Sequence, residues 1–163
     1  MTTPAADAVF VDTNVWVFAA VPAAPMHAAA VATLDALSPG ALWISRQVLR
    51  EFLAVLSRPQ TFFAGDAPMP NLVARASVIE ARCNVAEDGP LVTRKLHELL
   101  TSHETRGKQI HDANIVATML VRGIGSLLTH NAGDFQRWSG MIRVALLRDY
   151  QASGKAGAFE PAD

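Results

Sequence analysis

Residues 9–14 read VFVDTN, a short apolar run that ends in three polar residues. The run is rich in β-branched and aromatic residues and therefore predicts a buried strand. Asp12, Thr13 and Asn14 follow it, and aspartate, threonine and asparagine commonly cap the first turn of a helix. A strand that passes directly into a helix is typical of an α/β fold, and here it places an aspartate at the carboxyl end of the strand.

The same alternation continues along the rest of the chain. Strands are predicted at 8–11, 41–44, 84–86, 126–129 and 143–147, with helices at 28–37, 46–58, 71–83, 90–102 and 112–122. Three prolines and a glycine in residues 59–70 predict a loop. We therefore expect a three-layer α/β/α sandwich with a central, mostly parallel sheet of about five strands. Residues 1–150 are expected to form a single domain, and 151–163, rich in small residues, a disordered tail.

Composition limits the classes of function. The chain has 163 residues, 50% of them hydrophobic, and 14 Lys+Arg against 15 Asp+Glu give a net charge of -1. Such a chain can build a core, but a polyanion would have to meet a local basic patch or a bound metal. The single cysteine excludes a disulfide framework and a cysteine-rich zinc site. We find no apolar run of the roughly 18 to 20 residues that a membrane span needs and no basic secretory leader, so we expect a cytoplasmic protein without membrane association.

Four acidic residues fall where an α/β sheet gathers its ligands. Asp12 follows the first strand, and Asp134 follows the strand at 126–129. Ligands of such sheets bind outside the carboxyl ends of the strands. Glu51 lies at the edge of the apolar stripe of its helix, and Asp112 opens a helix that is apolar on nearly every face. A partly buried carboxylate needs a partner, so these positions call for an explanation.

Each acid also has an ordinary structural interpretation. Asp12 and Asp112 could cap helices, Glu51 could pair with an arginine, and Asp134 could belong to a turn. If the four converge, however, they repel one another, and a hard divalent cation such as Mg²⁺ or Mn²⁺ is the natural counter-ion for oxygen ligands. Nearby polar side chains would then hold the carboxylates by hydrogen bonds: Thr13, Asn14, Thr129 and Asn131.

Taken in order along the chain, four segments resemble those of the PIN-domain nucleases, and the size and layout resemble VapC-type toxin ribonucleases. The segments are VFVDTN, SRQVLREFLAVLSR, HDANIVA and LLTHNAGDF, and the resemblance extends over roughly residues 8 to 148. It implies a Mg²⁺- or Mn²⁺-dependent endoribonuclease that acts on RNA, with these catalytic, metal-binding acids: Asp12, Glu51, Asp112 and Asp134. It also implies supporting roles for Thr129 and Asn131, inhibition by a small antitoxin protein, and a homodimer.

The RNA backbone would need cations near these acids. Candidate RNA contacts are the basic residues close to the motifs: Arg46, Arg50, Arg106 and Lys108. A solvated surface charge is the commoner role for each of them alone. His111 and His130 adjoin the motifs and invite a role as general acid or base, but a structural role is the commoner one for such histidines. Phe62 and Phe63 in the predicted loop could contact a partner or pack back onto the domain.

Other functions remain open on the same residues. A phosphatase with a nucleophilic strand-end aspartate would want a second aspartate two residues later, and Asn14 stands there. A PIN-domain nuclease that processes RNA without being a toxin, or a catalytically weak module that binds RNA or protein, would keep the same fold. The four acids together favour the nuclease.

Overall fold

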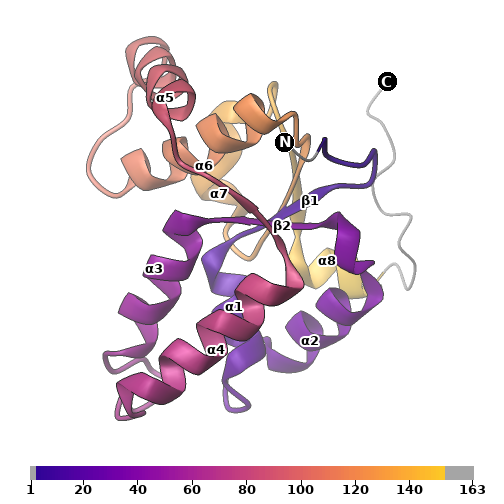
Figure 1. Ribbon diagram of the computed structural model, residues 1–163, viewed down its shortest axis with the longest axis vertical. Helices are drawn as coiled ribbons and strands as arrows, with labels where there is room; N and C mark the ends of the chain where they lie inside the picture. Colours follow the sequence, from indigo (N-terminus) through magenta and orange to yellow (C-terminus); the bar gives the residue numbers. More distant parts are fainter. Residues whose placement is uncertain (1–2, 153–163) are drawn as a thin grey trace.

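The computed structural model describes residues 3–152, and its strands and helices alternate along the chain (Figure 1). The five strands are β1 (Val9–Val11), β2 (Leu42–Ser45), β3 (Asn84–Ala86), β4 (Ser126–Thr129) and β5 (Arg143–Leu146). The six longer helices are α1 (Thr13–Ala20), α2 (His27–Ala36), α3 (Arg46–Leu56), α4 (Met69–Arg82), α5 (Pro90–Ser102) and α6 (Gln109–Arg122). Two short helices, α7 (Ala132–Phe135) and α8 (Leu147–Ala152), and two 3-10 turns, Pro39–Ala41 and Gln136–Trp138, complete the described chain.

The strands form one sheet in the order β3-β2-β1-β4-β5, and every neighbouring pair is parallel. Val11 of β1 lies opposite Leu128 of β4, so Asp12 and Thr129 leave the sheet side by side. The chain builds outward from β1 to β3 and then continues on the other side with β4 and β5. The strand order therefore reverses between β1 and β4, and this is where ligands of open parallel sheets collect.

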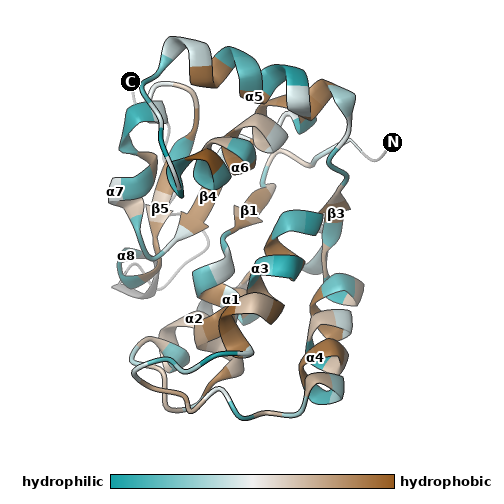
Figure 2. Ribbon diagram, turned by 90° about the vertical axis from the view of Figure 1, so that its left-hand side faces the viewer, coloured by the Kyte–Doolittle hydropathy of each residue, from teal (hydrophilic) through white to brown (hydrophobic). Residues whose placement is uncertain are grey.

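Helices cover both faces of the sheet. Helices α1 to α4 lie on one side, and α5 and α6 lie together on the other (Figures 1 and 2). The middle of the sheet between them, around β1, is hydrophobic (Figure 2), and Phe10, Leu127 and Leu128 are fully buried. This arrangement confirms the predicted α/β/α sandwich, with a sheet that is entirely parallel. Within residues 3–152, no helix has the length and apolar character needed to cross a membrane.

Some boundaries differ from those predicted. The predicted loop at 59–70 ends at Pro68, because Met69 and Pro70 already form the first turn of α4. Proline is tolerated there because the backbone N–H groups of the first turn have no partner within the helix. The helix predicted from Asp112 begins three residues earlier, at Gln109. Leu147 starts α8 instead of ending the last strand. Of the expected tail at 151–163, the first two residues belong to α8 and the others lie outside the described residues. The extent of the single domain stays a prediction.

Candidate active site

A cavity of about 560 Å³ opens at the carboxyl ends of β1 and β4. The four predicted acids all line it: Asp12, Glu51, Asp112 and Asp134. They come from segments that are far apart in sequence, namely the end of β1, helix α3, helix α6 and helix α7. The cavity lies at the reversal of strand order, where the parallel sheet is expected to hold its ligands.

Asp12 lies deepest, with 8% of its surface exposed. One carboxylate oxygen accepts a hydrogen bond from the Thr13 amide at 2.7 Å, so Asp12 caps α1. The other oxygen accepts hydrogen bonds from the Thr129 hydroxyl at 2.7 Å and from Asn14 Nδ2 at 2.8 Å. Burial raises the pKa of Asp12 to about 6, although these hydrogen bonds lower it. The capping role expected from the sequence and a place in the cavity therefore belong to the same side chain.

Glu51 is held by neutral partners, in place of the arginine considered from the sequence. Its Oε2 accepts a hydrogen bond from Thr13 Oγ1 at 2.9 Å. Its Oε1 accepts one from Gln47 Nε2 at 2.7 Å. Neither contact pairs the carboxylate with a cation, and Glu51 lines the same cavity as Asp12.

Asp112 is the acid most strongly affected by the others. It lies in the first turn of α6, whose N-cap is Lys108, so the interpretation of Asp112 as an N-cap is wrong. Its pKa is raised to about 7, first by burial and then by repulsion from Asp12, Asp134 and Glu51, while Arg137 lowers it. This mutual repulsion is the electrostatic result of bringing four carboxylates around one cavity.

Asparagine and threonine side chains connect the two strand ends. Asn14 Nδ2 also donates to Thr129 Oγ1 at 3.2 Å, and Asn14 Oδ1 accepts from the backbone N–H of His130 at 3.0 Å. The backbone N–H of Asn131 donates to Thr129 Oγ1 at 3.1 Å. Asn131 thus joins the network through its main chain, and its side chain lines the cavity. The four predicted supporting residues are all placed around the acids.

The predicted RNA contacts are spread over several surfaces. Lys108 lines the acidic cavity, and Arg50 lines a neighbouring one. Arg46 instead forms ion pairs with Glu80 and with Glu87, the latter at 2.8 Å. Arg106 is exposed and lies 3.3 Å from Glu104. Lys108 therefore lies near the acids, whereas the guanidinium of Arg46 is paired with Glu80 and Glu87.

Several residues that line the acidic cavity were not predicted from the sequence to lie there. Arg58, Gln60 and Phe62 reach the cavity from the segment that follows α3. The ring of Phe62 packs edge-on against Phe18 at 5.8 Å, and Phe63 also packs on the core, so packing is their observed role. An irregular loop carries no periodic pattern that would have located these side chains. The contact of Gln47 with Glu51 could have been predicted, because Gln47 lies four residues before Glu51 on the same helix face.

The loop that supplies these residues depends on Gly65. Gly65 has φ of 75°, and a Cβ at this position would lie 2.2 Å from the carbonyl carbon of Arg58. We expect Gly65→Ala to lower the free energy of unfolding by more than about 1 kcal/mol, measured by urea denaturation. Gly40→Ala is the matched control, because nothing lies within 4 Å of its added Cβ. Equal stability of the two variants would contradict this role of Gly65.

The donor set suits a hard cation. The cavity offers carboxylate oxygens with threonine and asparagine oxygens and one histidine, His111, and no cysteine lines it. Among the described residues, no three acidic, histidine or cysteine side chains are close enough to enclose an ion by themselves. Mg²⁺ dehydrates reluctantly and is usually bound by one or two carboxylates with water completing its shell. The residues present therefore fit Mg²⁺ or Mn²⁺ held partly through water.

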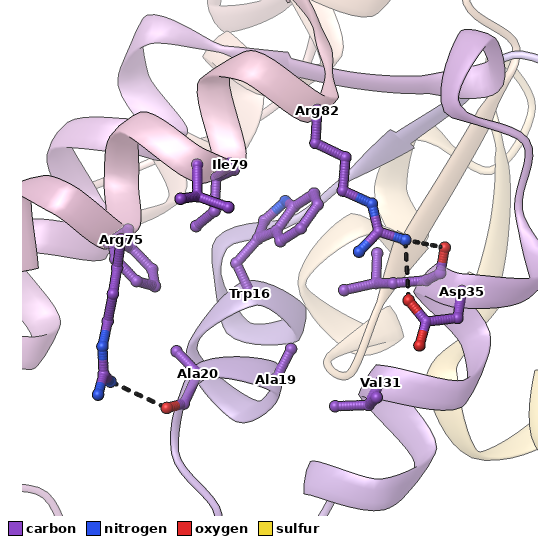
Figure 3. Close-up of a pocket in the computed structure, with 11 residues that line it drawn as sticks. Trp16, Ala19, Ala20, Val31, Asp35, Arg75, Ile79 and Arg82 are labelled. Atoms are coloured by element: carbon purple, nitrogen blue, oxygen red, sulfur yellow. Dashed lines mark hydrogen bonds and ion pairs between the residues drawn. The ribbon is translucent and has the colours of Figure 1, made fainter.

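A second cavity, of about 300 Å³, has a different character (Figure 3). It lies between α1, α2 and α4, and its walls are mainly apolar side chains around Trp16. Its one carboxylate, Asp35, pairs with Arg82 at 3.0 Å, and Arg75 donates to the carbonyl of Ala20 (Figure 3). The lining of this cavity holds no cluster of acids, so the acidic cavity is the candidate active site.

Comparisons with known proteins agree with this fold. VapC20 of Mycobacterium tuberculosis, a toxin that cleaves the sarcin-ricin loop, is 23% identical, with a TM-score of 0.59 over 74% of this chain and 87% of that chain. VapBC2 of Rickettsia felis bound to promoter DNA is 19% identical, with a TM-score of 0.62 over 85% of this chain and 97% of that chain. A toxin-antitoxin complex from Klebsiella pneumoniae is 19% identical, with a TM-score of 0.61 over 86% and 97%.

At these identities the likeness to solved structures establishes the fold. No match was found among curated proteins. The family model of the PIN domain matches residues 9–140, which is most of the chain and includes all four acids. On this match, the chain belongs to the PIN-domain family.

Proposed function

We propose that this protein is a metal-dependent endoribonuclease and the toxin of a toxin-antitoxin pair. The single observation that carries the nuclease proposal is that four acids from four separate segments line one cavity. PIN domains are typically nucleases that use divalent metals, and the chain has the fold of VapC toxins. The raised pKa of Asp112 adds support, because repulsion among the acids would be relieved by a cation.

Asp12 and Asp112 would be the main metal-holding residues, with Glu51 and Asp134 completing the site or orienting the attacking water. When bound, Mg²⁺ or Mn²⁺ would polarise the scissile phosphate and lower the pKa of a water molecule. The protein supplies the rigid placement. Asn14 and Thr129 hold the carboxylate of Asp12 by hydrogen bonds, and Thr13 holds that of Glu51. Because Asp12 accepts three hydrogen bonds, it is held as a fixed ligand and is poorly placed to act as a mobile nucleophile.

Asn14 makes the phosphatase alternative weaker. The position that would need an acid in that mechanism holds an amide that donates to Asp12 and Thr129. It therefore orients a carboxylate and has no proton to offer as a general acid. Hydrolysis by a water molecule needs no covalent intermediate on the protein.

The ends of the cleaved RNA test this mechanism. Attack of water in line on phosphorus, with the 3′ oxygen as the leaving group, gives a 5′ phosphate and a 3′ hydroxyl. We expect these ends when end-labelled RNA is digested with Mg²⁺ or Mn²⁺ and the products are tested with phosphatase and ligase. Products with 2′,3′-cyclic phosphates would contradict the proposal, because they require attack by the ribose 2′ hydroxyl.

The toxin role is the finer part of the proposal. Its support is the likeness to the VapC20, VapBC2 and Klebsiella structures, two of which are toxin-antitoxin assemblies. We expect expression of the chain to arrest growth of a bacterial host and the arrest to disappear in Asp112→Asn. Growth arrest by both proteins would contradict a toxic nuclease. RNA cleavage without growth arrest would instead favour an RNA-processing nuclease of the same family.

A small antitoxin protein and a homodimer are part of the same proposal. Sedimentation of the purified protein measures the dimer directly, and copurification with the product of a neighbouring gene measures the antitoxin. RNA binding without cleavage, with all four acids intact and Mg²⁺ or Mn²⁺ present, would favour a binding module.

A further inference from the structure

A third cavity, of about 470 Å³, adjoins the acidic one. It lies between α3 on one side and α5 and α6 on the other, and three residues line both cavities: Glu51, Ala54 and His111. The two cavities are therefore neighbours that share a wall through Glu51. A polynucleotide whose scissile phosphate lies at the acids has to leave them in two directions, and this cavity adjoins the acids on one side.

A chain of hydrogen bonds links the base of this cavity to the catalytic acid. Gln47, only 6% exposed, donates through Nε2 to Glu51 Oε1 at 2.7 Å and to the carbonyl of His111 at 3.0 Å. Its Oε1 accepts from Asn114 Nδ2 at 2.8 Å. Asn114 Nδ2 lies 3.3 Å from Asp88 Oδ2. The polar side of the cavity is thus a hydrogen-bond network that extends from Glu51 to the exposed carboxylate of Asp88.

The rest of the lining suits the flat faces and the edge of a nucleobase. Leu96 and Ile110 offer apolar surface, Thr93 adds a hydroxyl, and Arg50 is an exposed cation. A carboxylate only accepts hydrogen bonds, so Asp88 favours a base edge that presents two donors side by side. Guanine presents such a pair, N1–H and N2–H, when its Watson–Crick edge is unpaired. Proteins read single-stranded RNA by taking up splayed bases in this manner.

We propose that this cavity binds the guanine base of a nucleotide flanking the scissile phosphate, with Asp88 accepting from its Watson–Crick edge. The proposal rests on the proposed RNA cleavage and names a specificity site for it. Arg50 is placed to meet the phosphate of that nucleotide. Because Gln47 and Asn114 connect Asp88 to Glu51, an occupied cavity also fixes the catalytic carboxylate. The expected product is cleavage with a preference for guanine at one fixed position beside the cut.

The test is digestion of an RNA pool with a randomised segment, followed by sequencing of the cleavage sites. We expect the wild-type protein to favour guanine at one flanking position by about tenfold. Asp88→Asn should lose that preference, because an amide presents a donor to the base as well as an acceptor. Thr93→Arg, which places a bulky cation at an exposed lining position, should lose it by obstruction. Glu98→Gln is the control on α5, because Glu98 pairs with Lys95 and lines neither cavity. The guanine preference of this variant should equal that of the wild type.

The outcomes separate this inference from the proposed function. If the wild-type protein cleaves no RNA, the proposed function fails and the inference fails with it. If the wild type cleaves but shows no guanine preference, or if folded Asp88→Asn and Thr93→Arg keep it, only the inference is overturned. Sedimentation of the same variants adds one more arm. A change in oligomeric state with an unchanged preference would identify the cavity as a contact between protein chains and would also overturn the nucleotide site.

Discussion

Asp112→Asn is expected to reduce RNA cleavage by at least about 100-fold while leaving the protein folded. Asparagine keeps the shape of the side chain but removes the negative charge that would hold a divalent cation. Asp112 is repelled by the other three acids of the cavity, because Asp12, Asp134 and Glu51 all raise its pKa. The measurement is the rate of cleavage of a labelled RNA in saturating Mg²⁺ or Mn²⁺, with circular dichroism to verify the fold.

Asp149→Asn is the matched control for this change. Asp149 lies on α8, its side chain is 70% exposed, and its nearest ionic partner is Arg148. The same loss of one charge at this position should leave cleavage unchanged. Asp12→Asn should be as severe as Asp112→Asn, and Asp134→Asn less severe, since Asp134 is exposed at the cavity. Full activity of the Asp12 and Asp112 variants would remove the acidic cavity as the active site.

The position of Asp12 could be predicted because it depends on a local rule. A buried strand that passes into a helix places the junction residue at the carboxyl end of the strand, and a parallel sheet gathers such junctions at one edge. The sequence pattern of the strand and the capping residues after it therefore located the acid before any contact was known. The pairing of Asp12 with Thr129 needed the additional fact that β1 and β4 are neighbours, which follows from the order of all five strands.

Asp112 shows where local reasoning is incomplete. The apolar face of α6 correctly indicated a residue at the margin of the core, but the start of the helix was placed three residues too late. Polar residues before an apolar helix can extend it by a turn without changing the hydrophobic pattern, so the pattern alone does not locate the first residue. The predicted convergence of Asp112 with the other acids did not depend on the missing turn.

Contacts made by irregular segments lay beyond what sequence patterns can predict. Arg58, Gln60 and Phe62 reach the cavity because the loop folds back, with Gln60 and Phe63 forming a β-bridge and Gly65 allowing a close approach to Arg58. None of these contacts follows from a period of 2 or 3.6 residues. Likewise, Arg46 was expected near RNA from its closeness in sequence to Glu51. The direction of its side chain brings it to Glu80 and Glu87 instead.

The second large effect concerns the metal-free protein, which we expect to lose stability as the pH rises from about 4 to about 8. The pKa values of Asp12 and Asp112 are raised from the ordinary 3.8 to about 6 and about 7. In that range the folded protein therefore binds more protons at these sites than the unfolded chain does. The free energy of unfolding then falls with increasing pH and levels off above the folded pKa. Thermal unfolding in EDTA at pH 5 and pH 8 measures the difference.

Asp112→Asn should remove the Asp112 share of this pH dependence, leave the share of Asp12, and make the metal-free protein more stable at pH 8. One unit of pKa corresponds to about 1.4 kcal/mol, and because Asp112 is only partly buried we expect a gain of about 1 to 3 kcal/mol. For a chain of this size that is a rise of several degrees in the unfolding temperature, at about 2 to 4 °C per kcal/mol. Added Mg²⁺ or Mn²⁺ should stabilise the wild type at pH 8 and the variant much less. A variant that is less stable than the wild type in EDTA at pH 8 would mean that the acids do not repel, and the argument for a cation at this site would lose its physical basis.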